Sequence, residues 1–348
     1  MRSVVLIVSG RLDTRTGGYL YDWRMAEGLR QRGWSVDVRQ LDESFPHPTP
    51  TALANAAEVL AGLRDSALLL IDGLALGAMP EVIEHEAARL RIVALVHLPL
   101  GADVSLEPPV ARRLEAGERR ALAAAALIIV TGKATIAMLD RYDIARDRIV
   151  VVEPGTTRAP LARGSTGTPV QLLSVATVNP NKGHQILLEA LAAIPGHNWR
   201  LTCAGSVTRH PSTADRVRAT IRRLELEDHV ALVGELDASG LHECYDRADV
   251  FVSASLQETY GMAVAEALAR GLPVVGTTTG AIPDLVGADA GLLAPPGNID
   301  ALAEALARVI GDAPLRTRLA DGAKHVRERL RSWELAVDEM TAALETHE

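Results

Sequence analysis

Residues 258–275 read Glu258-Thr-Tyr-Gly-Met-Ala-Val-Ala-Glu-Ala-Leu-Ala-Arg-Gly-Leu-Pro-Val-Val275. This pattern predicts a loop, a helix that ends near Arg270 and then a buried strand. Glu258 falls in the loop, and Glu266 falls one turn inside the helix. A helix start exposes unpaired N–H groups and the positive end of the helix dipole, which suits a phosphate. Two carboxylates therefore flank a predicted anion site, unless they are simply two exposed acids of an ordinary helix.

The wider sequence alternates strand-like apolar runs with helical stretches. Such alternation predicts α/β units with parallel sheets that are covered by helices on both faces. A run rich in Gly, Pro and small polar residues, Glu153 to Pro169, interrupts this alternation, as an interdomain linker would. We therefore predict two Rossmann-like doubly wound domains that face an interdomain cleft: 1–158, a linker 159–169, and 170–330. A capped helix in 331–348 either closes its own domain or crosses back to the N-terminal one.

Composition limits the classes of function. A net charge of −8 argues against general nucleic-acid binding. No apolar run approaches the ~20 residues that span a bilayer, and the N-terminal run is shorter than a signal peptide. We expect a cytoplasmic protein. Two cysteines, Cys203 and Cys244, indicate neither a disulfide framework nor a metal pair.

Two loops of the N-terminal half carry candidate binding groups. The loop Thr14-Arg-Thr-Gly-Gly-Tyr19 places Gly17 and Gly18 before a helix, where backbone amides can approach a phosphate, although a plain tight turn has the same pattern. The run Leu95-Val-His97-Leu-Pro-Leu100 places His97 at a strand end. There it either hydrogen-bonds a sugar or acceptor hydroxyl or has a structural role. Asp103 and Glu107 follow it as alternatives for assisting an acceptor.

The C-terminal half begins with Val175-Ala-Thr-Val-Asn-Pro-Asn-Lys-Gly-His184. Lys182 precedes a helix, where a cation opposes the helix dipole. That mismatch favours a bound diphosphate over a solvated lysine. The sequence has no D-x-D pair to hold a metal, so we expect no metal and no cofactor apart from the donor substrate.

Together these motifs resemble those of the retaining family 4 glycosyltransferases, which have the GT-B fold and an E-x7-E motif. The resemblance extends over almost the whole chain. Ala176 and Thr177 depart from the family's Gly-Arg-x-x-x-x-Lys-Gly pattern. The exchange at Thr177 is the larger one, because a hydroxyl cannot replace a bidentate guanidinium.

The resemblance implies a role for each motif. Glu266 would hold the ribose, and Glu258 the transferred sugar. Amides near Tyr260, Gly261 and Met262 would meet the sugar and diphosphate. Lys182 and Thr177 would lie at the phosphates, Gly17 and Gly18 near the phosphate and acceptor, and His97 at the reacting sugar. The N-terminal domain would be the acceptor side and the C-terminal domain the donor side.

The expected function is metal-independent transfer of a sugar from a nucleoside diphosphate (UDP or GDP type) to a hydroxyl-bearing acceptor, with retention. An epimerase or phosphorylase of the same fold, or a non-catalytic nucleotide-sugar binding protein, are the alternatives. The acceptor stays open among small molecules, natural products, glycans and lipid-linked compounds. The basic helix with Arg112, Arg113, Arg119 and Arg120 either meets anionic lipid at the inner membrane face or forms a solvated, salt-bridged surface.

Overall fold

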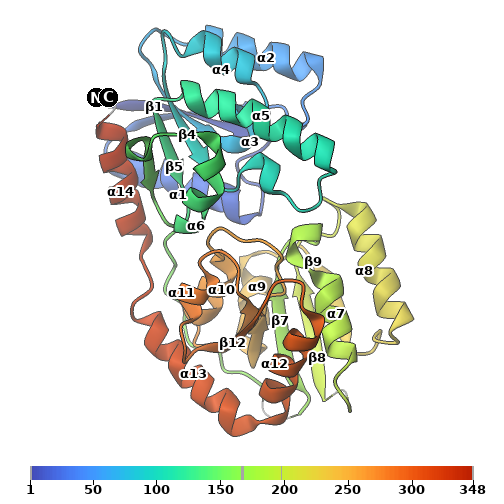
Figure 1. Cartoon of the computed structure of the whole chain (residues 1–348). Helices are drawn as coiled ribbons and strands as arrows, with labels where there is room; N and C mark the ends of the chain where they lie inside the picture. The colour runs from blue at the N-terminus through green and yellow to red at the C-terminus, as the bar shows by residue number, and fades with distance from the viewer. Residues whose placement is uncertain (1, 166–167, 197, 347–348) are drawn as a thin grey trace. The chain divides into compact units, whose positions relative to one another are not determined.

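The computed structural model describes residues 2–165, 168–196 and 198–346. The chain forms two compact units (Figure 1). Unit 1 consists of Met1–Gly155 together with Arg331–Glu348, and unit 2 of Thr156–Leu330. Residues 166 and 167 of the predicted linker lie outside the described residues. The linker residues before them are bound to unit 2: the N–H of Ala162 donates to Arg270 O, and the N–H of Gly164 to Asp246 O.

Unit 1 is a six-stranded parallel sheet with the order β2-β1-β3-β4-β5-β6. Its strands are β1 (Ser3–Ser9), β2 (Ser35–Leu41), β3 (Leu68–Asp72), β4 (Arg91–Val96), β5 (Leu127–Val130) and β6 (Ile149–Val151). Its helices are α1 (Gly17–Gln31), α2 (Pro50–Ala61), α3 (Gly73–Leu76), α4 (Pro80–Glu86), α5 (Pro108–Ala124), α6 (Lys133–Leu139) and α14 (Trp333–Glu345), with short 3-10 turns η1 (Leu100–Ala102), η2 (Asp140–Tyr142) and η3 (Arg146–Arg148).

Two separate apolar clusters cover the two faces of this sheet. Because side chains alternate along a strand, Leu69 and Ile71 of β3 lie in one cluster, whereas Leu68 and Leu70 lie in the other. The second cluster includes Val337 and Met340 of α14, which packs against α1. The last helix is therefore part of the fold of unit 1 (Figure 1).

Unit 2 is a second six-stranded parallel sheet, with the order β12-β11-β10-β7-β8-β9. Its strands are β7 (Val170–Val175), β8 (Trp199–Ala204), β9 (Val230–Gly234), β10 (Val250–Val252), β11 (Val274–Thr277) and β12 (Gly291–Ala294). Its helices are η4 (Pro180–Lys182), α7 (His184–Ala192), α8 (Pro211–Arg223), α9 (Ala238–Arg247), α10 (Met262–Leu268), α11 (Ile282–Val286), α12 (Ile299–Gly311) and α13 (Ala313–Arg327).

The fold class predicted from the sequence, two Rossmann-like parallel sheets with helices, is confirmed. Two helix boundaries have clear local causes. The side chain of Asn298 accepts a hydrogen bond from the N–H of Ala301 at the start of α12, and Gly33 takes a φ of 82° after α1. The edge strand β12 was not predicted, because Gly291-Leu-Leu-Ala294 is short and has no alternation. No helix among the described residues has both the length and the apolar character needed to cross a bilayer.

The strand order locates the switch point of each sheet. In unit 1 the chain runs outward from β1 to β2 and then returns to β3 on the other side of β1. In unit 2 it runs from β7 to β8 and β9, and β10 then pairs with the opposite side of β7. Ligands of open α/β sheets bind outside the carboxyl ends of the strands at such reversals. The loops after β1 and β3, and those after β7 and β10, are therefore the expected sites.

Candidate functional site

The switch point of unit 2 brings Lys182 and Glu258 into contact. Lys182 ends the loop after β7, and Glu258 lies in the loop after β10. The Lys182 Nζ–Glu258 Oε1 distance is 2.5 Å, and the two side chains are 26% and 17% exposed. The hydroxyl of Ser255 donates to the same carboxylate oxygen, at an Oγ–Oε1 distance of 2.9 Å. A cation and an acid from segments 76 residues apart are thus held together in a partly desolvated place.

Close backbone contacts fix these two loops. Gly183 takes a φ of 63°, and a Cβ there would lie 2.1 Å from Ala254 O. The N–H of Leu256 donates to Asn181 O at 2.7 Å. Gly280 (φ 57°) packs closely against the backbone of Glu258, because a Cβ at Gly280 would lie 2.3 Å from Glu258 O. The backbone that carries the Lys182–Glu258 pair is therefore packed too tightly for side chains at either glycine.

The second predicted acid, Glu266, lies within α10. The helix begins after Gly261, which has a φ of 97°, so the N–H groups of Met262 and its neighbours form the helix start. Tyr245 donates its hydroxyl to Glu266 Oε2 at 3.1 Å, and Arg270 stacks 4.2 Å from the centre of the Tyr245 ring. Burial, together with the charge of Glu266, raises the pKa of Tyr245 well above its usual value, so Tyr245 acts as a donor to this carboxylate.

Thr177 and Tyr260 also lie around this switch point. Thr177 follows β7, and its backbone lies close to Gly205: a Cβ on Gly205 would lie 2.9 Å from Thr177 N. Tyr260, which comes between Glu258 and the start of α10 in the sequence, is buried. His184, the first residue of α7, is buried with neither ring nitrogen hydrogen-bonded within the described residues. Burial, and then the charge of Lys182, lower its pKa to about 4, so the ring is neutral.

The switch point of unit 1 holds the other predicted residues. Gly17 begins α1, and a Cβ on Gly18 would lie 3.4 Å from Cδ2 of His97, so the Gly-Gly loop and the end of β4 meet. Asp22 of α1 and Asp72 at the end of β3 are buried beside His97. The His97 Nε2–Asp22 Oδ1 distance is 2.8 Å. Asp103, by contrast, accepts hydrogen bonds from the N–H and the hydroxyl of Ser105 and so closes its own loop.

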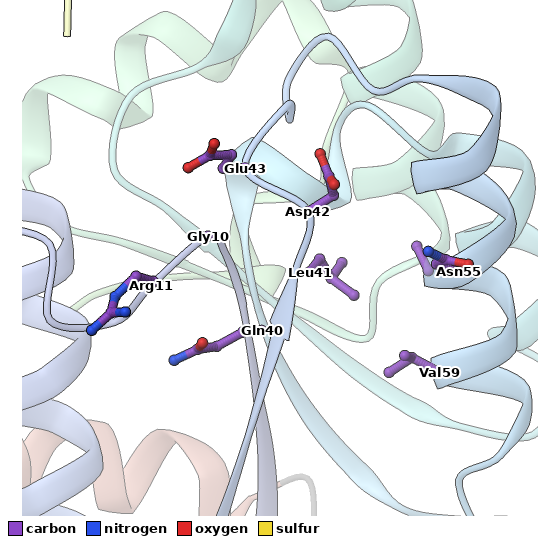
Figure 2. A pocket seen from close by; sticks show the side chains of 9 residues that line it. Gly10, Arg11, Gln40, Leu41, Asp42, Glu43, Asn55 and Val59 are labelled. Carbon is purple, nitrogen blue, oxygen red and sulfur yellow. The ribbon is translucent and has the colours of Figure 1, made fainter.

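A hollow of about 370 Å³ lies at the carboxyl ends of β1 and β2 in unit 1. Figure 2 shows that polar side chains from these strand ends and from α2 surround it. They include Gln40, Asp42, Glu43 and Asn55, with Leu41 and Val59 as apolar neighbours. Amide and carboxylate groups around an open hollow are suited to hydrogen-bonding a polyhydroxyl ligand.

The predicted residues thus fall into two sets, each gathered at its own switch point: Gly17, Gly18 and His97 in unit 1, and Thr177, Lys182, Glu258, Tyr260, Gly261, Met262 and Glu266 in unit 2. That both sets meet one ligand stays a prediction. Sequence reasoning missed Asp22, Asp72, Ser255, Tyr245 and His184. Asp22 stands on the apolar face of α1, beside Tyr21 and Met25, and a lone acid in such a pattern is the one signal that could have revealed it. Within the described residues, no three His, Cys, Asp or Glu side chains gather as metal ligands would.

The arrangement in unit 2 can bind an anion and hydroxyls together. The starts of α7 and α10 and the Lys182 ammonium supply positive potential, whereas Glu258 and Glu266 accept hydrogen bonds. In the structure, Glu258 neutralises Lys182. A diphosphate would compete for the same ammonium and would leave Glu258 able to accept from a sugar hydroxyl.

Comparisons with known proteins agree with this chemistry. Residues 160–326 match the family described as glycosyl transferases group 1. The D-inositol 3-phosphate glycosyltransferase of Corynebacterium glutamicum (strain R) is 30% identical over 209 residues, which cover 55% of this chain and 50% of that protein. The MMP alpha-(1->4)-mannosyltransferase of Mycolicibacterium hassiacum is 25% identical over 331 residues, which cover 89% of this chain and 79% of that protein. This chain spans about half the length of several of the curated relatives that it matches.

Solved structures match over the whole fold. Sucrose-phosphate synthase from Thermosynechococcus elongatus superposes with a TM-score of 0.84 at 21% identity, over 99% of both chains. Anabaena Alr3699/HepE in complex with UDP-glucose superposes with a TM-score of 0.77 at 17% identity, over 99% of this chain and 100% of that one. The chain therefore has the GT-B fold, and residues 160–326 of unit 2 match the family described as glycosyl transferases group 1.

Proposed function

We propose that the protein is a glycosyltransferase that moves a sugar from a nucleoside diphosphate to a hydroxyl-bearing acceptor. The observation that carries the proposal is the Lys182–Glu258 pair at the switch point of unit 2, between two helix starts. It combines a cation for the diphosphate with an acceptor of sugar hydroxyl hydrogen bonds. The names of the relatives, an inositol phosphate glycosyltransferase and a mannosyltransferase, and the UDP-glucose bound to a protein of the same fold support this reading.

In this proposal Glu266 binds the ribose and the N–H groups at the start of α10 bind the diphosphate. As the bond from the anomeric carbon to the phosphate oxygen breaks, negative charge grows on the β-phosphate, and Lys182 stabilises it. The lack of an arginine at Thr177 gives Lys182 a larger share of that task. Donors of both UDP and GDP type fit these groups, because none of them reads the base.

Family 4 membership, retention and metal independence are finer parts of the proposal. They rest on the motif resemblance and on the lack of a D-x-D pair in the sequence. Retention without an enzyme nucleophile requires the new bond from carbon to the acceptor oxygen to form on the face that the phosphate leaves. The acceptor proton then passes to a β-phosphate oxygen. The anomeric configuration of the product, read by NMR, tests this route, and an inverted product excludes it.

We further propose that the protein works in the cytoplasm. Two arginines of α5 do not favour a lipid-binding face, because Arg120 binds Glu81 and Glu84 and Arg119 binds Glu115. The salt-bridged alternative is therefore the better one for this half of the helix.

The hollow at Asp42 and Asn55 is the proposed place for a polyhydroxyl acceptor.

The first experiment is a panel of nucleotide sugars and nucleoside diphosphates tested for thermal stabilisation, followed by transfer assays with the donor that binds. Lys182→Met should lower kcat by roughly 100- to 1000-fold, as expected for the loss of one donor at a developing oxyanion. Lys324→Met, which removes an exposed lysine of the same unit paired with Asp321, is the matched control and should leave kcat unchanged. Stabilisation by no member of the panel, or equal activity of both variants, would contradict the proposal. Turnover of the donor alone to its epimer would identify an epimerase instead.

A further inference from the structure

Asp22 is a buried acid that the transfer chemistry described above does not use. It lies on α1, is 1% exposed, and its Oδ1 is 2.8 Å from Nε2 of His97. When Asp22 is ionised, its carboxylate can only accept, and the bond is then donated by the Nε2–H of the imidazole. The other oxygen, Oδ2, has no hydrogen-bond partner within the described part of the chain.

The ring of His97 is fixed from several sides. Tyr21 packs its ring edge-on, with ring centres 5.4 Å apart, and its own hydroxyl is anchored on Val152 O at 2.9 Å. The loop at Gly18 runs close to the ring, because a Cβ built on Gly18 would lie 3.4 Å from Cδ2 of His97, in ordinary van der Waals contact. The His97 side chain is nevertheless 22% exposed. With Nε2 held by Asp22, Nδ1 is the ring atom left for a ligand.

Burying two acids beside the His97 ring costs folding free energy. Asp72 is 2% exposed; burial, and then the charge of Asp22, raise its pKa to about 7. Burial lowers the pKa of His97, but the charge and hydrogen bond of Asp22 and the charge of Asp72 outweigh it and raise that pKa above its usual value. Two buried acids around one imidazole contribute little to stability compared with an apolar core. Such clusters are typical of functional sites.

We propose that Asp22 is a positioning residue: it fixes the His97 ring and keeps a proton on Nε2, so that Nδ1 faces a hydroxyl of the sugar-bearing ligand. This inference rests on the proposed function for its ligand, but the orientation of the ring does not. The charge of Asp72 adds to that of Asp22 in raising the pKa of the ring. Among the described residues, the titratable groups around the imidazole are Tyr21, Asp22 and Asp72.

The first test uses the free protein and needs no substrate. Imidazole ¹⁵N shifts of His97 are followed from pH 5 to 9, with the signal assigned by its loss in His97→Gln. In the wild type, we expect the neutral ring to hold its proton on Nε2. Asp22→Asn should lower the pKa of His97 and produce a mixture of both tautomers. Asp72→Asn, the matched control, should lower the pKa but keep the proton on Nε2. An unchanged tautomer in Asp22→Asn overturns the inference.

The second test measures transfer with the donor and acceptor found for the wild type. Asp22→Asn should lower kcat by at least about tenfold, with the KM for the donor little changed, and should shift the pH profile of kcat. Asp22→Glu should recover part of the loss. Circular dichroism and thermal unfolding show whether each variant is folded, and a loss in proportion to unfolded protein contradicts the role. A wild type that binds no nucleotide sugar refutes the proposed function, whereas a fully active Asp22→Asn refutes only this inference.

Discussion

Gly280 is the residue at which the shape of the proposed donor site depends most directly on a missing side chain. It takes a φ of 57°, and a Cβ there would lie 2.3 Å from the carbonyl oxygen of Glu258. Gly280→Ala should therefore cost about 1–2 kcal/mol for the left-handed backbone and a further amount for moving Glu258. We expect lower stability of unit 2 and weaker binding of the nucleotide sugar, as measured by thermal unfolding and titration calorimetry.

Gly234→Ala is the matched control for this change. Gly234 has a similar φ of 73°, but no atom of another described residue beyond its chain neighbours lies within 4 Å of a Cβ built there. It should lose the same conformational free energy and keep its affinity for the nucleotide sugar. If both variants bind equally well, the contact between Gly280 and Glu258 has no part in shaping the site.

At this scale, the sequence predicted some site residues and not others for a physical reason. Lys182 and Glu258 stand at strand-to-helix loops, whose position at the carboxyl edge of a parallel sheet follows from the strand pattern alone. Asp22 and His184 stand on the buried faces of helices, where a polar residue is one exception in an apolar pattern. Their partners, or the lack of them, are set by tertiary packing that spacing along the chain does not encode.

At the scale of elements, the contact between α1 and α14 depends on one close approach. A Cβ on Gly28 would lie 2.3 Å from Cγ2 of Val337. Alanine is favoured over glycine in a helix by about 1 kcal/mol, but overpacking costs typically 1–3 kcal/mol. Gly28→Ala should therefore destabilise unit 1, as measured by chemical unfolding. Adding Val337→Ala should restore part of the loss, because the double change removes the overlapping methyl groups.

Gly311→Ala is the control, because it gains helix propensity without overpacking a neighbouring element. Gly311 ends α12, and in the described part of the chain no other element lies within 4 Å of a Cβ built there. This variant should therefore be as stable as the wild type or more so. A stabilising Gly28→Ala would mean that α14 does not pack as closely on α1 as the structure shows.

The predictability of elements follows how deeply they are buried. The strands β3 and β5 are apolar at nearly every position because both faces of the sheet are covered, and such runs are recognisable as buried strands in the sequence. The edge strand β12 has only one neighbour, β11, and its short Gly-Leu-Leu-Ala sequence gives no period to detect. Within the segment expected to be a linker, the N–H and the hydroxyl of Ser165 donate hydrogen bonds to the Asp249 carboxylate.

At the scale of the whole molecule, the two units should respond to acid in opposite directions. In unit 2, the folded-state pKa of His184, about 4, lies below its usual 6.5. The folded state therefore binds fewer protons than the unfolded state, and its stability falls as the pH drops from about 6.5 to 4, by about 3 kcal/mol. In unit 1, burial raises the pKa values of Asp72 and Glu118 to about 7. There the folded state binds more protons, and stability rises over the same interval.

Hydrogen exchange resolved by peptide measures this difference, because it reports the opening free energy of each region separately. After correction for the intrinsic rate, lowering the pH from 6.5 to 4.5 should weaken protection in β7 and β8 and strengthen it in β3 and β5. His184→Leu should abolish most of the change in unit 2, and Glu118→Gln should reduce that in unit 1. His242→Gln, on the exposed surface of α9, is the control for a histidine substitution as such. Protection that falls equally in both units, or a pH response of unit 2 that survives His184→Leu, would show that groups other than His184 dominate the response to acid.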